Sequence, residues 1–211
     1  MKTRVYVDGF NFYYAIRRGD ERGDFQLGLG WCDFRKLAEQ HLIRSEQVVD
    51  TIKYFTAPVE RFAIRSGEER RQRLWLDALS TIQGIQIIEG LHQKHERKPR
   101  EEKQTDINIA VELLIDAING ECDRAILITG DIDQAPAVNA ARRRLPHEKR
   151  VEVDVWVPPG LAYGRWRGEA AKRGFSCKQI TVGMLEDSRL PDRIVGSSGK
   201  VIDCLPEWLV T

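Results

Sequence analysis

The sequence predicts an α/β fold in which a doubly wound parallel sheet carries helices on both of its faces. Segments that read as short strands alternate with segments of helical periodicity, which is typical of repeated strand-helix-strand units. The segment 125–129 is continuously apolar, as a strand covered on both faces of a parallel sheet would be. The segment 151–157 alternates with period two and predicts a half-covered edge strand. These observations favour a five-stranded sheet with the order 3-2-1-4-5.

Each element follows from the local sequence. Gly9 permits a tight turn from the first strand into a helix, and Gly67 can kink or split the longest helical pattern. From Cys177 onward we expect a helix followed by an extended arm. The predicted strands are 4–7, 51–55, 85–88, 125–129 and 151–157, and the predicted helices are 33–41, 60–82, 106–119, 134–145 and 160–173.

The length and composition predict one main domain. A chain of 211 residues can bury a full core, and we expect residues 1–176 to form the domain and residues 177–211 to pack on it. No apolar run approaches the roughly 20 residues that span a bilayer, and charges interrupt the N-terminus before a signal-peptide core could form. We therefore expect a cytoplasmic protein without a membrane partner. Four scattered cysteines lack the short spacing of zinc or redox motifs, which favours buried thiols.

Acidic residues follow the two strands that this order places side by side. The first strand ends at Asp8, and the fourth runs into Asp131 and Asp133. In a doubly wound sheet the chain leaves these two strands toward opposite faces, so a crevice opens at their carboxyl ends. Asp106, which opens the helix before the fourth strand, is a further candidate. We expect Asp8, Asp106 and Asp131 to converge within metal-bridging distance.

Each acid also has a structural explanation when it is taken alone. Asp8 could cap a turn or a helix, and Asp133 could cap the helix that begins near Gln134. Asp106 would stabilise the first turn of its helix by about 0.3–1 kcal/mol. Their joint occurrence instead predicts a site for Mg²⁺ or Mn²⁺, which prefer oxygen ligands. The set contains no His or Cys, which argues against zinc.

Two further acids lie on the helix of Asp106. Asp116 lies about 15 Å from Asp106 along the helix axis and about 80° around it. We therefore do not expect Asp106 and Asp116 to bind the same ion directly. Glu112 lies about 120° off the Asp106 face and is expected to be solvated. Asn108 is a candidate for supporting the ligands from behind.

Three motifs resemble the NYN domain, particularly its LabA-like branch, a division of the PIN-like nucleases. They are VYVDGFNF at 5–12, EKQTDINIAVELLIDA at 102–117 and AILITGDIDQAPAV at 125–138, and the match covers about residues 3 to 158. The resemblance implies a Mg²⁺- or Mn²⁺-dependent endoribonuclease. It places Asp8, Asp106, Asp131 and Asp133 on the acidic positions that bind metal and catalyse. It places Asn11, a candidate for binding the substrate, on the amide of the first motif. Asp116 falls on a recurrent helix aspartate, for which our geometry favours a supporting role.

The chain departs from the family pattern at two positions. Family members usually have Phe or Leu where this chain has Gln134, and Ser more often than Thr129. Neither change removes a carboxylate, so we interpret both as tuning or packing.

An RNA partner, single-stranded or with unpaired regions, would need contacts outside the acidic pocket. The net charge of +1 does not by itself indicate a nucleic-acid partner. The basic runs on the helices near 61–73 and 142–150 are most simply interpreted as solvated faces. The polar loop 92–103 leads directly into Asp106, and its basic side chains are suited to binding the phosphate backbone of RNA. Tyr13 and Trp31 are candidates for stacking on unpaired bases. The candidate loop contacts are Lys94, Lys98, Arg100 and Lys103.

Two other function classes stay open or are weakened. A catalytically weak RNA-binding or regulatory module could keep the same fold and pocket. A phosphotransferase with an aspartyl nucleophile would need a second acid two residues after Asp8, where this chain has Phe10. No phosphate-binding loop of the Gly-x-x-x-x-Gly-Lys-Ser/Thr type occurs. The oligomeric state is left open, a homodimer included.

Overall fold

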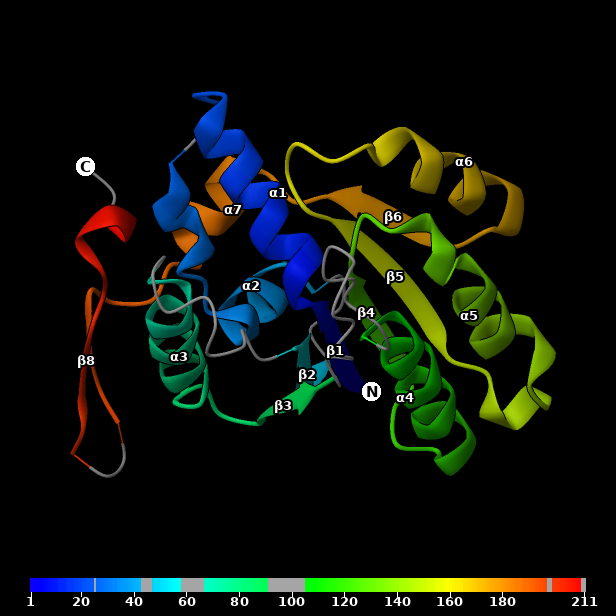
Figure 1. Ribbon diagram of the computed structural model, residues 1–211. Coiled ribbons are helices and arrows are strands. Elements are labelled where there is room, and N and C mark those ends of the chain that lie inside the picture. The colour runs from blue at the N-terminus through cyan, green and yellow to red at the C-terminus, as the bar shows by residue number, and fades with distance from the viewer. Residues whose placement is uncertain (25, 43–46, 58–66, 91–104, 197–198, 210–211) are drawn as a thin grey trace, which may run out of the picture.

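The computed structural model describes residues 1–24, 26–42, 47–57, 67–90, 105–196 and 199–209 (Figure 1). The described residues form a parallel six-stranded sheet with the order β3-β2-β1-β4-β5-β6 and a separate antiparallel pair, β7-β8. The doubly wound fold and the order of the first five strands are therefore confirmed. The strands are β1 (Lys2–Asp8), β2 (Val48–Thr56), β3 (Ile85–Glu89), β4 (Arg124–Ile128), β5 (Glu152–Val157), β6 (Ser176–Gln179), β7 (Arg193–Val195) and β8 (Val201–Asp203).

Helices cover both faces of the large sheet, and each face buries its own apolar core. Helices α1, α2, α3 and α7 lie on one side, and α4, α5 and α6 lie on the other (Figure 1). The helices are α1 (Gly9–Glu21), α2 (Phe34–Gln40), α3 (Glu68–Leu79), α4 (Thr105–Asn119), α5 (Ala135–Asn139), α6 (Tyr163–Arg173) and α7 (Val182–Asp187). Short helical turns are η1 (Leu27–Gly30), η3 (Ile132–Gln134), η4 (Ala140–Arg144), η5 (His147–Lys149) and η6 (Pro206–Trp208).

Local sequence explains where several helices begin. Asp33 accepts hydrogen bonds from the backbone N–H groups of Arg35 and Lys36, which caps α2. Gly67 adopts a left-handed conformation (φ 69°) immediately before α3, so the long predicted helix begins in the described residues only at Glu68. Residues 58–66 of that prediction lie outside the described part. The predicted helix 134–145 is divided between η3, α5 and a π-type turn, η4.

The prediction that β5 is an edge strand is wrong. β6 pairs with it from Asp154 opposite Ser176 to Val157 opposite Gln179. The alternation in β5 is misleading because Asp154 is buried rather than solvated, and its carboxylate pairs with Arg124 of β4. The polar sequence of β6 gave no strand signal because β6 lies at the edge and is half exposed.

The tail is more structured than a helix and an arm. After α7 the chain forms the antiparallel β7-β8 pair, which lies beside α3 (Figure 1), and the described residues end with η6, which contacts η1. Ile202, Leu205 and Trp208 are buried in the same core as α1 and α2. The C-terminal segment therefore helps to build this face of the molecule. None of the described helices combines the length and the apolar character that a membrane crossing requires.

Candidate functional site

The carboxyl ends of β1 and β4 meet beside the start of α1. Asp8 ends β1, and only 4% of its surface is exposed. Its Oδ1 accepts a hydrogen bond from the backbone N–H of Asn11 (3.0 Å), which caps α1. Its Oδ2 accepts one from the hydroxyl of Thr129, the residue after β4 (2.9 Å). Both oxygens of Asp8 are thus oriented by neighbours from two strand ends.

Further hydrogen bonds join the same two chain segments. The Thr129 hydroxyl accepts from the backbone N–H of Asp131 (3.0 Å), and the Asn11 side-chain oxygen accepts from that of Gly130 (2.6 Å). A Cβ on Gly130 would lie 2.5 Å from the side chain of Leu161, so a larger residue there would require Leu161 to shift. Thr129 and Asn11 therefore fix the relative positions of Asp8 and Asp131. Sequence reasoning had assigned Asn11 to the substrate and Thr129 to tuning or packing.

The acids after β4 are oriented by a short turn. Asp131 accepts a hydrogen bond from the backbone N–H of Asp133 (3.0 Å) and caps η3, so the expected capping role of Asp133 belongs to Asp131. The buried amide of Gln134 donates to the backbone oxygen of Asp106 (2.9 Å), the second residue of α4. Gln134 thereby ties the acidic turn to the first turn of α4. We call Asp8, Asp106, Asp131 and Asp133 together the acidic edge.

Negative charge gathers at the acidic edge. Partial burial raises the pKa of Asp106, and the nearby carboxylates of Asp131 and Asp133 raise it further. No described cationic side chain forms an ion pair with any of these three residues. The donor set contains only oxygen, and its mutual repulsion is what a hard divalent cation would relieve, so the residues fit Mg²⁺ or Mn²⁺.

The side chains do not, however, form a coordination cluster. Among the described residues, no three His, Cys, Asp or Glu side chains are arranged so that they could hold a metal ion. The predicted convergence of Asp8, Asp106 and Asp131 to metal-bridging distance is therefore not observed. Asp8 instead accepts hydrogen bonds from Asn11 and Thr129, and Asp131 accepts one from the backbone N–H of Asp133.

Asp116 lies in a buried ionic cluster between α4 and the sheet. Its carboxylate contacts Arg4 (2.8 Å) and Lys53 (2.7 Å) and accepts a hydrogen bond from the hydroxyl of Tyr6 (2.6 Å). Burial raises its pKa, but the hydrogen bonds from Lys53 and Tyr6 outweigh burial and leave the pKa lowered. Glu112 was expected to be solvated, yet it also pairs with Lys53 (2.6 Å). These contacts anchor α4 to β1 and β2.

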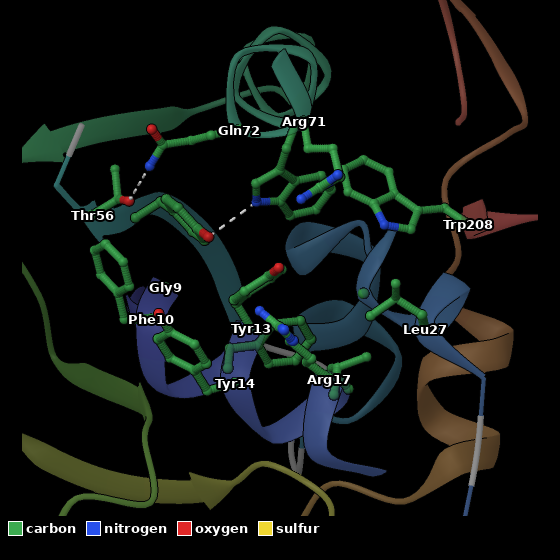
Figure 2. Close-up of a pocket in the computed structure, with 15 residues that line it drawn as sticks. Gly9, Phe10, Tyr13, Tyr14, Arg17, Leu27, Thr56, Arg71, Gln72 and Trp208 are labelled. Atoms are coloured by element: carbon green, nitrogen blue, oxygen red, sulfur yellow. Dashed lines mark hydrogen bonds between the residues drawn. The ribbon is translucent and has the colours of Figure 1, made fainter. Parts of the chain in front are cut away.

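An aromatic pocket lies on the other side of the start of α1. Its walls come from α1, η1, the end of β2, α3 and η6, and Tyr13 lies among them (Figure 2). The prediction that Trp31 could stack on bases is wrong, because Trp31 is 1% exposed and packs against Trp75 and Trp208. Sequence reasoning missed Trp75, Trp208 and Arg71 as pocket residues.

The other predicted site residues are placed as follows. Asn108 is half-buried near the start of α4. The loop candidates lie outside the described residues, and they are Lys94, Lys98, Arg100 and Lys103.

A model of the NYN domain matches residues 2–158 of the chain. The chain belongs to the NYN domain family. The family is one of PIN-like nucleases, and the matched region contains β1 to β5 and the whole acidic edge. The NYN domain here is also similar to the 6-hydroxy-3-succinoylpyridine 3-monooxygenase HspA of Pseudomonas putida (strain DSM 28022 / S16). The two sequences are 31% identical over an alignment 223 positions long. The alignment covers 82% of this chain and 68% of that protein. No solved structure matches the chain.

Proposed function

We propose that this NYN domain is a divalent-metal-dependent endoribonuclease that cleaves RNA phosphodiester bonds at the acidic edge. The observation that carries the proposal is the set of four aspartates at the ends of β1 and β4 and the start of α4, inside a family of nucleases. Hydrogen bonds from Asn11, Thr129 and Gln134 connect the segments that bear these acids.

Asp8, Asp106, Asp131 and Asp133 would hold Mg²⁺ or Mn²⁺. The bound ion would supply an activated water and neutralise charge that develops on the phosphodiester. The chain itself contributes orientation, because the Thr129 hydroxyl fixes one oxygen of Asp8 and the cap of η3 fixes one of Asp131. Asp116 keeps α4 on the sheet, and Asn108 is proposed to support the ligands from behind.

The substrate is proposed to be RNA that is single-stranded or has unpaired regions. Tyr13 would stack on a base and the side-chain NH₂ of Asn11 would donate to the substrate, while the loop supplies phosphate contacts. The proposed loop contacts are Lys94, Lys98, Arg100 and Lys103.

Purified protein incubated with mixed single-stranded and structured RNAs tests the proposal. We expect internal cleavage with Mn²⁺ or Mg²⁺ and none with EDTA, because the acids alone cannot neutralise the phosphodiester. Binding without cleavage under every condition would contradict the nuclease and favour a regulatory RNA-binding module.

The loop can be tested separately through binding. Replacing Lys94, Lys98 and Arg100 with alanine should weaken RNA binding and flatten its salt dependence, by about 0.7 in the log–log slope for each lost phosphate contact on single strands. Replacing Arg165, Arg167 and Lys172, which are exposed on α6, provides a control of equal charge change. An unchanged salt slope in the loop variant would show that the loop does not contact RNA.

A second candidate is a monooxygenase that acts on a heteroaromatic acid. The similarity to the Pseudomonas enzyme favours it, since the alignment covers most of both chains. Such an enzyme would transfer one atom of O₂ to its substrate and reduce the other to water, which requires two electrons from an added reductant. Hydroxylation of 6-hydroxy-3-succinoylpyridine, followed by mass spectrometry, distinguishes this candidate from the nuclease.

A further inference from the structure

The aromatic pocket is open to solvent at its mouth, and its lining is mainly apolar. Ligand pockets typically combine apolar walls with a few polar groups. The pocket follows that pattern, with rings on its walls and two arginines, Arg17 and Arg71, among its lining residues (Figure 2).

Contacts between the rings fix the walls of the pocket. On α1, Phe10 stacks on Tyr14 with ring centroids 6.2 Å apart, and Tyr13 meets Tyr14 edge-on at 5.3 Å. Across the pocket, the indole N–H of Trp75 donates to the hydroxyl of Tyr54 (3.0 Å). Rings held in this way offer flat apolar surfaces at little entropic cost, and such surfaces suit another planar ring.

The two arginines of the pocket differ in their carboxylate partners among the described residues. Arg17 uses its Nε to bind Glu21 (2.9 Å). Arg71 forms no ion pair with any residue that the structure describes. Figure 2 shows both guanidinium groups in the space between α1 and α3. A guanidinium that pairs with no described carboxylate and lines an apolar pocket favours an anion, because it binds carboxylate or phosphate through two parallel hydrogen bonds.

We infer that this pocket binds a planar heteroaromatic ring that carries an anionic group. The ring packs between the aromatic walls, and the anion pairs with Arg71 and Arg17. Two sources have this chemistry, an unpaired nucleotide of an RNA chain and a free heteroaromatic carboxylic acid. An RNA nucleotide in the pocket would lie near the acidic edge, because Gly9 and Phe10 line the pocket and directly follow Asp8. Binding in the pocket depends on neither cleavage nor oxygenation.

Tryptophan fluorescence tests the inference without catalysis, since Trp75 and Trp208 both line the pocket. Titrations in EDTA would compare two matched pairs of ligands, adenosine 5′-monophosphate with adenosine and pyridine-3-carboxylate with pyridine-3-carboxamide. We expect at least one anionic ligand to quench the fluorescence and to bind about 10-fold or more tightly than its neutral partner. Preference within the first pair identifies a nucleotide site, and preference within the second identifies a site for a small acid.

Arg71→Gln should abolish the preference for the anionic partner. Arg70→Gln is the matched control, because Arg70 is exposed on the same helix and does not line the pocket. The inference is overturned if no ligand quenches the fluorescence, if neutral and anionic partners bind equally, or if the two variants lose affinity to the same extent. Circular dichroism of both variants would establish that α3 remains folded.

Discussion

Asp131→Asn should reduce RNA cleavage in Mn²⁺ by about 100-fold or more, roughly 3 kcal/mol of barrier. The change keeps the size of the side chain and removes one negative charge from the acidic edge. Asparagine also caps helical turns well, so the hydrogen bond from the backbone N–H of Asp133 is retained and the fold should survive. RNA affinity measured in EDTA should stay the same or rise, because a charge that repels phosphate has gone. Single-turnover cleavage and EDTA binding on both proteins provide the measurement.

Asp33→Asn is a matched control for this variant. Asp33 also caps a helix, accepting hydrogen bonds from Arg35 and Lys36, and it does not belong to the acidic edge. The Asp33→Asn variant should therefore cleave RNA at the wild-type rate. Equal cleavage by wild type and Asp131→Asn would exclude Asp131 as a catalytic ligand.

Asp116→Ala should lower the free energy of unfolding by about 3–5 kcal/mol. The substitution removes the carboxylate that the half-buried Arg4 and the buried Lys53 share, and it removes the carboxylate acceptor of the Tyr6 hydroxyl. Arg4 keeps its pair with Glu121 and Lys53 keeps its pair with Glu112. Urea denaturation at pH 7 measures the effect. Asp77→Ala removes a helix aspartate with one exposed ion pair, to Lys200, and should cost about 1 kcal/mol or less.

Acid should remove the same stabilisation in the wild type. The folded pKa of Asp116 is lowered, so its contribution is complete above its ordinary pKa of 3.8 and is lost as the pH falls through the lower folded value. The difference in stability between wild type and Asp116→Ala should therefore narrow below pH 4. If Asp116→Ala instead has the stability of the wild type but does not cleave RNA, Asp116 acts on the substrate rather than on the fold.

The order of the strands and the meeting of the acidic motifs were predictable from sequence. The first strand ends in Asp8, and a continuously apolar strand is followed by the other acids. These two features predict where the chain turns at the sheet edge. The orientation of each carboxylate was not predictable. Asp8 and Asp131 are oriented by Thr129 and Asn11, whose hydrogen bonds depend on side-chain positions that periodicity does not encode.

Tertiary pairing also defeated two interpretations based on periodicity. Asp154 reads as a solvated residue of an edge strand, but it is buried because Arg124 neutralises it. Arg71 reads as part of a solvated helical face, yet it lines a pocket whose other walls come from α1 and from the distant η6. Trp208 gives no local signal of this role, since the segment between it and α3 is more than a hundred residues long.

The position of Trp208 links the pocket to the C-terminal segment. Arg189 donates a hydrogen bond to the backbone oxygen of Trp208 (2.9 Å), and Trp31 packs against its ring, so these contacts hold η6 on the core. If a ligand touches Trp208 in the docked state only, ligand binding and docking of η6 are linked equilibria. Each must then strengthen the other by the same free energy. Filling the pocket would thus make undocking of η6 less favourable.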